Sequence, residues 1–103
     1  MIATVYAVFA DEAEARRIGR AMVEAKLAAC VNILAPCHSF YRWEGALLEA
    51  DEVPALFKTR ADQAQALIAA IAEAHSYAVP AILLWPIEAA YPPYAEWVEK
   101  SVR

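Results

Sequence analysis

Two cysteines and two histidines are the side chains of this sequence best suited to bind a soft or borderline metal ion. Cys30, Cys37 and His38 lie in the stretch CVNILAPCHSFYRWEG, whereas His75 comes much later. A thiolate at Cys30 could bind Cu(I), although a free cysteine is more often a small buried apolar residue. Adjacent residues of a strand point to opposite faces, so Cys37 and His38 can share an ion only if Pro36 bends the chain. No spacing here matches a known metal motif.

A second group of candidate residues lies around the next expected strand. Glu52 and Lys58 are six residues apart, so both point to one face of a regular strand. A cationic Lys58 beside Thr59 at a helix N-terminus would suit an anion, and a solvated strand end is the alternative. Tyr41 and Trp43 share a strand face, where they could stack on a ligand or pack against a neighbouring subunit.

Nothing in the sequence predicts an enzyme. His38 and His75 are the only histidines, and neither has an evident acid partner in a Ser/His/Asp triad. Gly19 and Gly45 are the only glycines, so a Gly-rich phosphate loop is excluded. His75 is expected at a helix C-terminus, where the helix dipole favours the protonated imidazolium and disfavours metal binding at neutral pH.

Composition predicts one domain, residues 1–103, that hides part of its surface against a partner. Hydrophobic residues make up 61% of the chain, against roughly 45–50% in soluble proteins, and much of the excess is alanine. The formal net charge of -4 argues against nucleic acid as a ligand.

The apolar runs are too short for a membrane-spanning helix, and the N-terminus lacks the features of a signal peptide. We therefore expect a cytoplasmic protein without a membrane partner. Cys30 and Cys37 would be ~23 Å apart on an extended strand, so both thiols should be reduced.

Hydrophobic periodicity predicts alternating strands and helices. The strand signals cover Ile2 to Phe9, the stretch from Ala29 onward, Leu47 to Lys58, and VPAILLWPIEA. The helix signals begin at Asp11 as N-cap, at Thr59 as candidate cap of a helix that ends near His75, and at the prolines of YPPYAEWVEKSVR.

This order predicts an α+β, ferredoxin-like βαββαβ fold with a short C-terminal helix. Both main helices would cover one face of a four-stranded antiparallel sheet. Because the strands are apolar on both faces, the open face needs a cover that the remaining chain is too short to supply. Oligomerisation through the sheet is the expected solution.

Four separated motifs resemble those of the CutA family, the divalent-cation tolerance proteins: AACVNI, SFYRWEG, EVPALFKT and HSYAVP. They occur in the family's order and at matching spacing along nearly the whole chain. The resemblance implies a ferredoxin-like protomer in a tight homotrimer whose sheets join edge to edge. It also implies binding of divalent metals, copper above all, and a role in metal tolerance.

The resemblance also implies which residues meet in the clefts between subunits. The family's elements fall here on Cys30, on Tyr41, Trp43, Glu44 and Gly45, on Glu52, Lys58 and Thr59, and on His75 and Tyr77.

The chain departs from the family pattern HPYEVPE, which here reads HSYAVPA. Ser76 replaces the proline, and Ala78 and Ala81 replace two glutamates, which removes oxygen donors near His75. The resemblance therefore implies copper or another divalent cation bound weakly by His75 and Cys30, with water or another subunit completing the site. Cys37 has no counterpart as a fixed ligand.

A different class of function remains open beside metal binding. The chain could be a trimeric signalling or adaptor protein that senses a small molecule, because PII regulators resemble it in subunit fold. In that interpretation Lys58 contacts an anionic metabolite and Trp43 stacks on it. The sequence does not identify a protein partner.

Overall fold

The computed structural model describes residues 1–103. Five strands, three α-helices and one short 3-10 helix follow one another along the chain. Their bounds are β1 Ile2–Phe9, α1 Glu12–Glu24, β2 Cys30–Ile33, β3 Cys37–Trp43, β4 Ala46–Arg60, η1 Ala61–Gln63, α2 Ala64–Ala74, β5 Ile82–Pro86 and α3 Pro92–Ser101.

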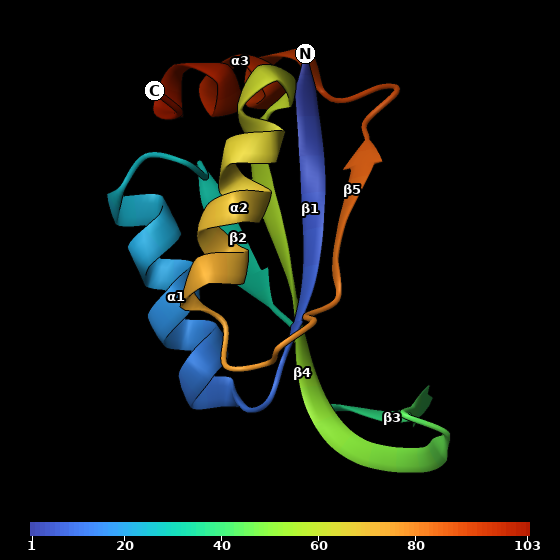
Figure 1. The fold of residues 1–103 in the computed structure, drawn as a ribbon. Helices are drawn as coiled ribbons and strands as arrows, with labels where there is room; N and C mark the ends of the chain where they lie inside the picture. The colour runs from blue at the N-terminus through green and yellow to red at the C-terminus, as the bar shows by residue number, and fades with distance from the viewer.

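The strands form an antiparallel sheet with the order β2-β4-β1-β5, and β3 pairs with the far part of β4. Helices α1 and α2 lie side by side on one face of this sheet, and α3 lies across one end of it (Figure 1). The expected α+β fold with an antiparallel sheet and both main helices on one face is therefore confirmed.

The core fills the space between the sheet and the two helices. Alternate residues of β1, among them Val5 and Phe9, point toward the helices and are fully buried. Phe9 packs against Phe57 of the neighbouring β4 with 6.3 Å between ring centroids. From the helices, Ile18 of α1 and Leu67 of α2 complete this layer. The apolar spacing of the sequence thus predicted the buried stripes of both helices.

The N-terminal residues of α1 and α3 explain why these two helices begin where they do. Asp11 caps α1, because its Oδ1 accepts a hydrogen bond from Glu14 N at 2.8 Å. At α3, Pro92 and Pro93 occupy the first helical positions, where the missing N–H costs nothing. Both expectations are confirmed.

The stretch from Cys30 to Trp43 is two strands rather than the single strand expected. It breaks at residues 34–36 into β2 and β3, which makes the sheet five-stranded instead of four-stranded. Pro36 lies in this break, because it has no N–H for a sheet ladder. Leu34 N still donates to Pro54 O at 2.9 Å, so the chain stays attached to β4 as it turns.

Thr59 does not cap the second helix, and this expectation is wrong. It is the penultimate residue of β4, fully buried, and its hydroxyl donates to Leu27 O at 2.7 Å. The strand continues to Arg60, a 3-10 turn follows, and α2 begins only at Ala64, after Gln63. A strand residue that faces the core is not available as a cap.

The β3–β4 hairpin extends beyond the body of the molecule. Its turn is formed by Glu44 and Gly45, both with positive φ, at 50° and 82°, as a two-residue hairpin of the primed type requires. β4 curves strongly along its length, so the hairpin turns away from the body below the start of β5 (Figure 1). The molecule is accordingly elongated, with extents of 45 × 25 × 23 Å. Its helices are all too short or too polar to cross a membrane.

Candidate functional site

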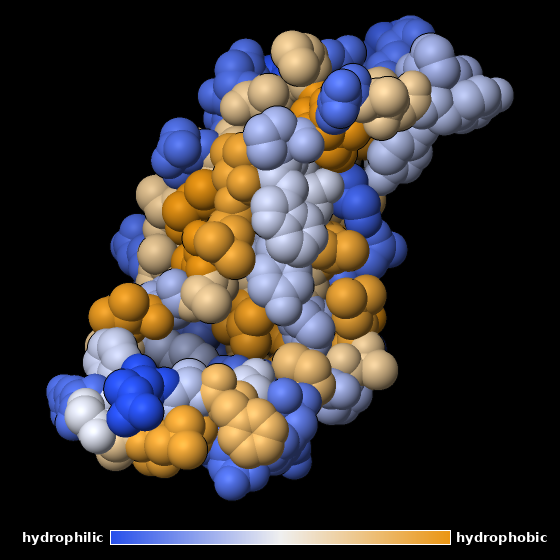
Figure 2. Space-filling model, turned by 90° about the vertical axis from the view of Figure 1, so that its right-hand side faces the viewer, coloured by the Kyte–Doolittle hydropathy of each residue, from blue (hydrophilic) through white to orange (hydrophobic).

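A cavity of about 540 Å³ lies between the curved hairpin and the loop that follows α2. In the space-filling view the surface is hollowed where the hairpin, at the bottom, meets the body (Figure 2). The cavity brings together side chains from three segments, which are Tyr41 and Trp43 of β3, Leu48 and Glu52 of β4, and Tyr77 and Val79 of the loop. Four of the residues predicted for a ligand cleft, Tyr41, Trp43, Glu52 and Tyr77, thus line one space.

Strand alternation and register explain why these side chains converge. Tyr41 and Trp43 are two residues apart on β3 and therefore share a face. Tyr41 lies opposite Leu48, and Cys37 lies opposite Glu52, so the same face of β4 carries Leu48 and Glu52. Because β4 curves, this face becomes the concave side of the hairpin (Figure 1).

Glu52 and Tyr77 form a hydrogen bond inside the cavity. The Tyr77 hydroxyl donates to Glu52 Oε2 at 2.8 Å, and Glu52 is only 9% exposed. Burial, followed by this hydrogen bond to the carboxylate, raises the pKa of Tyr77 well above its usual value. Tyr77 therefore stays a hydroxyl donor at physiological pH and fixes the orientation of the carboxylate.

His75 lies directly behind the cavity and is held by the backbone on both ring nitrogens. Nε2 lies 2.7 Å from Val8 O, and Nδ1 lies 3.1 Å from Tyr77 N. A carbonyl can only accept and an amide N–H can only donate, so these partners select the neutral ring with the proton on Nε2. The ring also stacks on Phe9 at 5.1 Å between centroids.

This environment differs from the expectation for His75. The ring is buried, and its two hydrogen-bond partners suit the uncharged imidazole, whereas the helix-dipole argument favoured the imidazolium. Its one lone pair, on Nδ1, is occupied by the Tyr77 N–H. A metal ion could bind this imidazole only after that hydrogen bond is broken.

Glu14, in the first turn of α1, is a buried carboxylate that supports the loop beside the cavity. Its Oε1 accepts from Ala10 N at 3.0 Å, and its Oε2 accepts from Ser76 N at 2.9 Å. Burial alone would raise the pKa of Glu14, but the hydrogen bonds from Ser76 and Ala10 outweigh it and lower the pKa. The carboxylate thus ties the start of α1 to the loop that carries Tyr77. The family pattern has proline at position 76, and proline has no N–H to donate, so this bond depends on Ser76.

Cys30 and Lys58 lie on another part of the sheet. The two residues are paired across β2 and β4. Lys58 is six residues along β4 from Glu52, which corresponds to roughly 20 Å at the rise of a strand. Cys30 is a free, half-buried thiol whose Sγ lies 3.4 Å from Tyr94 Oη. Burial, together with this hydrogen bond, raises the pKa of Tyr94 to about 12. Lys58 donates to the Asn32 side chain. The structure therefore divides the predicted residues into two groups.

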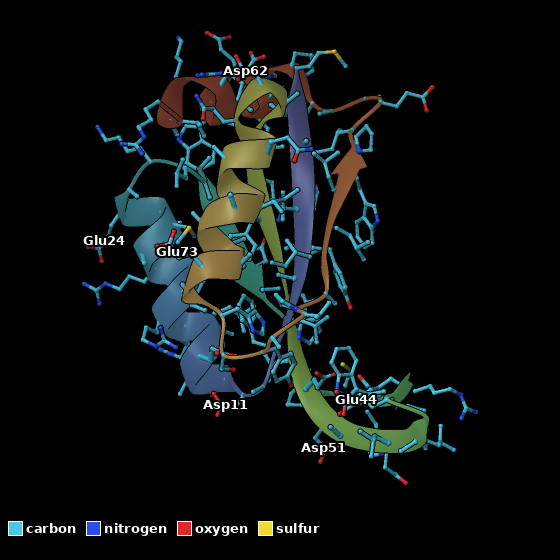
Figure 3. All side chains as sticks on the ribbon, viewed as in Figure 1. Asp11, Glu24, Glu44, Asp51, Asp62 and Glu73 are labelled. Carbon is cyan, nitrogen blue, oxygen red and sulfur yellow. The ribbon has the colours of Figure 1, made fainter.

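Cys37 and His38 do not converge on a common site. His38 is exposed on the convex side of the hairpin, between Asp51 Oδ1 and Glu49 Oε1, each 2.7 Å from a ring nitrogen. These bonds, with Asp51 first, raise the pKa of His38. Figure 3 shows Asp51 pointing outward from this side of β4. Cys37 is on the other face of β3, with its Sγ 3.9 Å from Ser39 Oγ. No group of three or more His, Cys, Asp or Glu side chains is arranged to hold a metal ion within one protomer.

Residues 3–101 match the family model described as CutA1 divalent ion tolerance protein. The chain is 38% identical over 97 residues to the protein named CutA homolog of Xenopus laevis, which covers 94% of this chain and 64% of that protein. It is 36% identical over 93 residues to the divalent-cation tolerance protein CutA of Pectobacterium atrosepticum, which covers 90% of this chain and 84% of that protein. The chain spans 56% of the length of mouse protein CutA.

Solved structures show the same fold. The periplasmic divalent cation tolerance protein CutA of Archaeoglobus fulgidus superimposes with a TM-score of 0.96 at 35% identity, covering 100% of both chains. The divalent cation tolerance protein of Thermus thermophilus gives a TM-score of 0.95, also at 35% identity and 100% coverage of both chains. Together with the family model, which matches almost the whole chain, these similarities show that the chain belongs to the CutA family of divalent-cation tolerance proteins.

Proposed function

We propose that this protein acts in the cell's tolerance of metals by binding copper weakly through Cys30, at a site that one protomer leaves incomplete. Membership of the divalent-cation tolerance family supports a role in metal tolerance generally. The observation that carries the finer proposal is the free, half-buried Cys30 thiol on the sheet face opposite α1 and α2, where α3 contacts it through Tyr94. Thiolate sulfur is the softest ligand in the chain and prefers copper, above all Cu(I).

Weak binding follows from the small number of donors around Cys30. The sulfur is hydrogen-bonded to Tyr94 Oη at 3.4 Å, and a neutral phenol is a poor ligand for a soft ion. The remaining ligands would come from water or from a second copy of the chain. Copper bound at such an open site exchanges readily, in contrast to a metal ion held in a closed tetrahedral site.

A homotrimer is the second part of the proposal. The strand order β2-β4-β1-β5 with both main helices on one face supports a ferredoxin-like protomer as the unit of this trimer. The opposite face carries Tyr6 stacked on Trp85 at 5.0 Å between centroids, and Leu83 and Trp85 are 50% and 48% exposed. Figure 2 shows hydrophobic atoms in patches along the body and on the hairpin. Three copies that join their sheets edge to edge would cover this face.

The proposed location and the exclusion of nucleic acid follow from the two free cysteines and from the net charge. A cytoplasmic trimer fits the two reduced cysteines. The net charge of -4 disfavours nucleic acid as a partner. No catalytic step is proposed, because the polar clusters described above are satisfied by the fold and none places a nucleophile beside a base.

The copper site is tested by a pair of cysteine variants. Equilibrium dialysis against copper, kept reduced under anaerobic conditions, would compare the wild type with Cys30→Ser and Cys37→Ser. We expect Cys30→Ser to lose most of the bound copper and Cys37→Ser to retain it, because Cys37 lies on the separate hairpin. Equal copper uptake by all three proteins would overturn the assignment of Cys30.

A second candidate function, a trimeric sensor or adaptor that binds a small molecule, is favoured by the cavity beside the hairpin. Its volume of about 540 Å³ lies within the usual range for small-molecule sites. Lys58, the anion contact expected from the sequence, does not line this cavity and is bonded to Asn32. A thermal-shift screen would test this function, because a ligand of the native state raises its melting temperature. A Trp43→Leu variant should lose any such shift, and a shift that it retains places the ligand elsewhere.

A further inference from the structure

The charge inside the cavity is negative. Glu52 is the one lining residue with an acidic side chain, and it belongs to the concave face of the hairpin. Arg42 also borders the cavity, but alternation along β3 directs its side chain to the face opposite Tyr41 and Trp43. Because most other lining residues are hydrophobic, the Glu52 carboxylate dominates the local field.

Three aromatic side chains line the same cavity as this carboxylate. Tyr41, Trp43 and Tyr77 all line the cavity, and each ring presents an electron-rich face that attracts a cation. Trp43 provides the strongest such face among the aromatic side chains. One carboxylate and three aromatic rings in a single, mostly apolar cavity match the composition of sites that recognise alkylammonium groups.

We propose that this cavity binds a small organic cation, a quaternary ammonium or a protonated amine with an apolar body, with Glu52 as its counter-ion. The inference rests on the second candidate function and names the chemical class of its ligand. It replaces the anionic metabolite expected from the sequence, because Lys58 lies outside the cavity and a carboxylate lies inside it.

A bare metal ion fits the cavity less well than an organic cation. Calcium and magnesium need about six oxygen ligands, and the cavity offers one carboxylate, the hydroxyls of Tyr41, Tyr77 and Ser39, and apolar walls. An alkylammonium ion holds its water less strongly and gains from contact with aromatic and aliphatic groups. The cavity volume matches a whole small molecule better than a single ion.

The cavity is held in shape before any ligand arrives. Tyr77 Oη fixes Glu52, while the backbone N–H of Tyr77 donates to His75 Nδ1. The adjacent Ser76 N–H is held by Glu14 on α1. The contacts of Tyr77 with Glu52 and of Ser76 with Glu14 join residues that are 25 and 62 positions apart. The carboxylate and the loop are therefore preorganised, which lowers the cost of binding.

The experiment compares four probes on the full-length assembled protein by isothermal titration calorimetry. Choline and benzyltrimethylammonium are the cations, the carbon isostere of choline is the uncharged control, and benzoate is the anion. We expect both cations to bind and the uncharged isostere to bind about tenfold more weakly, since it lacks the charge that Glu52 and the rings attract.

Two charge variants locate the effect. Glu52→Gln keeps the size and the acceptor for Tyr77 but removes the charge, so it should reduce choline binding about tenfold, to the level of the isostere. Glu49→Gln makes the same change on the same strand, but on the convex face beside His38, and should leave binding unchanged. If Glu52→Gln does not fold, the comparison of choline with its isostere on the wild type decides by itself.

The outcomes separate the ligand class from the existence of a ligand site. Equal binding of choline and its isostere, or equal loss in Glu52→Gln and Glu49→Gln, would overturn the role of Glu52. Binding of benzoate but not of choline, abolished by Trp43→Leu, would overturn the cationic class while retaining a small-molecule site. Absence of binding by every probe, including at millimolar concentration, would overturn the inference itself, and only the thermal-shift screen would then support the sensor function.

Discussion

Replacement of Glu14 by glutamine should destabilise the protein measurably, although Glu14 lies outside the cavity. Its two carboxylate oxygens accept separate backbone hydrogen bonds, from Ala10 N at 3.0 Å and Ser76 N at 2.9 Å, and the side chain is 6% exposed. A glutamine keeps one acceptor and turns an amide N–H toward the other donor. Because a hydrogen bond to a charged group contributes roughly 1.5–3 kcal/mol, we expect the free energy of unfolding to fall by about 2 kcal/mol.

The pH dependence of this loss carries a definite sign. Hydrogen bonds lower the pKa of Glu14 in the folded protein, so the stabilisation is fully present above the unfolded-state value of about 4.3. It disappears as the pH falls through the lower, folded-state pKa. The difference between wild type and Glu14→Gln should therefore be constant near neutral pH and shrink in the acid range.

Urea unfolding at one fixed protein concentration measures the difference, since an oligomer's stability depends on concentration. Glu12→Gln is the matched control, because Glu12 is in the same first turn of α1 but exposed, 3.9 Å from Arg16. Glu12 and Glu14 both interact favourably with the dipole at the start of α1, so the control variant also loses that interaction. We expect Glu12→Gln to lower the free energy of unfolding by less than about 0.5 kcal/mol. Equal losses in the two variants, or a Glu14→Gln loss that persists undiminished in acid, would refute the reasoning. Hydrogen exchange at the Ser76 amide should also become faster in Glu14→Gln.

Two further predictions concern residues whose environments differ from expectation. Thr59→Val should lower the free energy of unfolding by about 1–3 kcal/mol in urea titrations, because it leaves the buried Leu27 carbonyl without the Thr59 hydroxyl; a neutral effect would show that water replaces it. For His38, NMR titration should give a pKa above the usual histidine value, and Asp51→Asn should move it back down. A titration of His38 unaffected by Asp51→Asn would show that the ion pair with Asp51 does not form in solution.

The sequence predicted those elements whose signals are local. Asp11 and the periodic apolar residues of α1 lie within a few turns of one another, so the cap and the buried face could be predicted from spacing. Pro36 correctly indicated a distortion, but not that the strand would divide into β2 and β3. Thr59 was misassigned because its residue type suits a helix cap, while its place in the alternation of β4 directs it into the core.

The site depends on contacts that no local pattern reveals. Tyr41, Trp43, Glu52 and Tyr77 were grouped by resemblance to a family, and the cavity that they line is consistent with that grouping. His75 is bonded to Val8, 67 residues away, and Glu14 to Ser76, 62 residues away. Neither partner could be inferred without the fold, because both contacts are made by backbone groups, which every residue carries. This explains why His75 was predicted as a free ligand.

X-ray absorption at the copper edge of the loaded protein tests the proposed metal role most directly. If copper binds through Cys30, the wild type and Cys37→Ser should both show sulfur in the first coordination shell, and Cys30→Ser should show only nitrogen and oxygen. A copper environment without sulfur in the wild type, or one identical in all three proteins, would contradict the account.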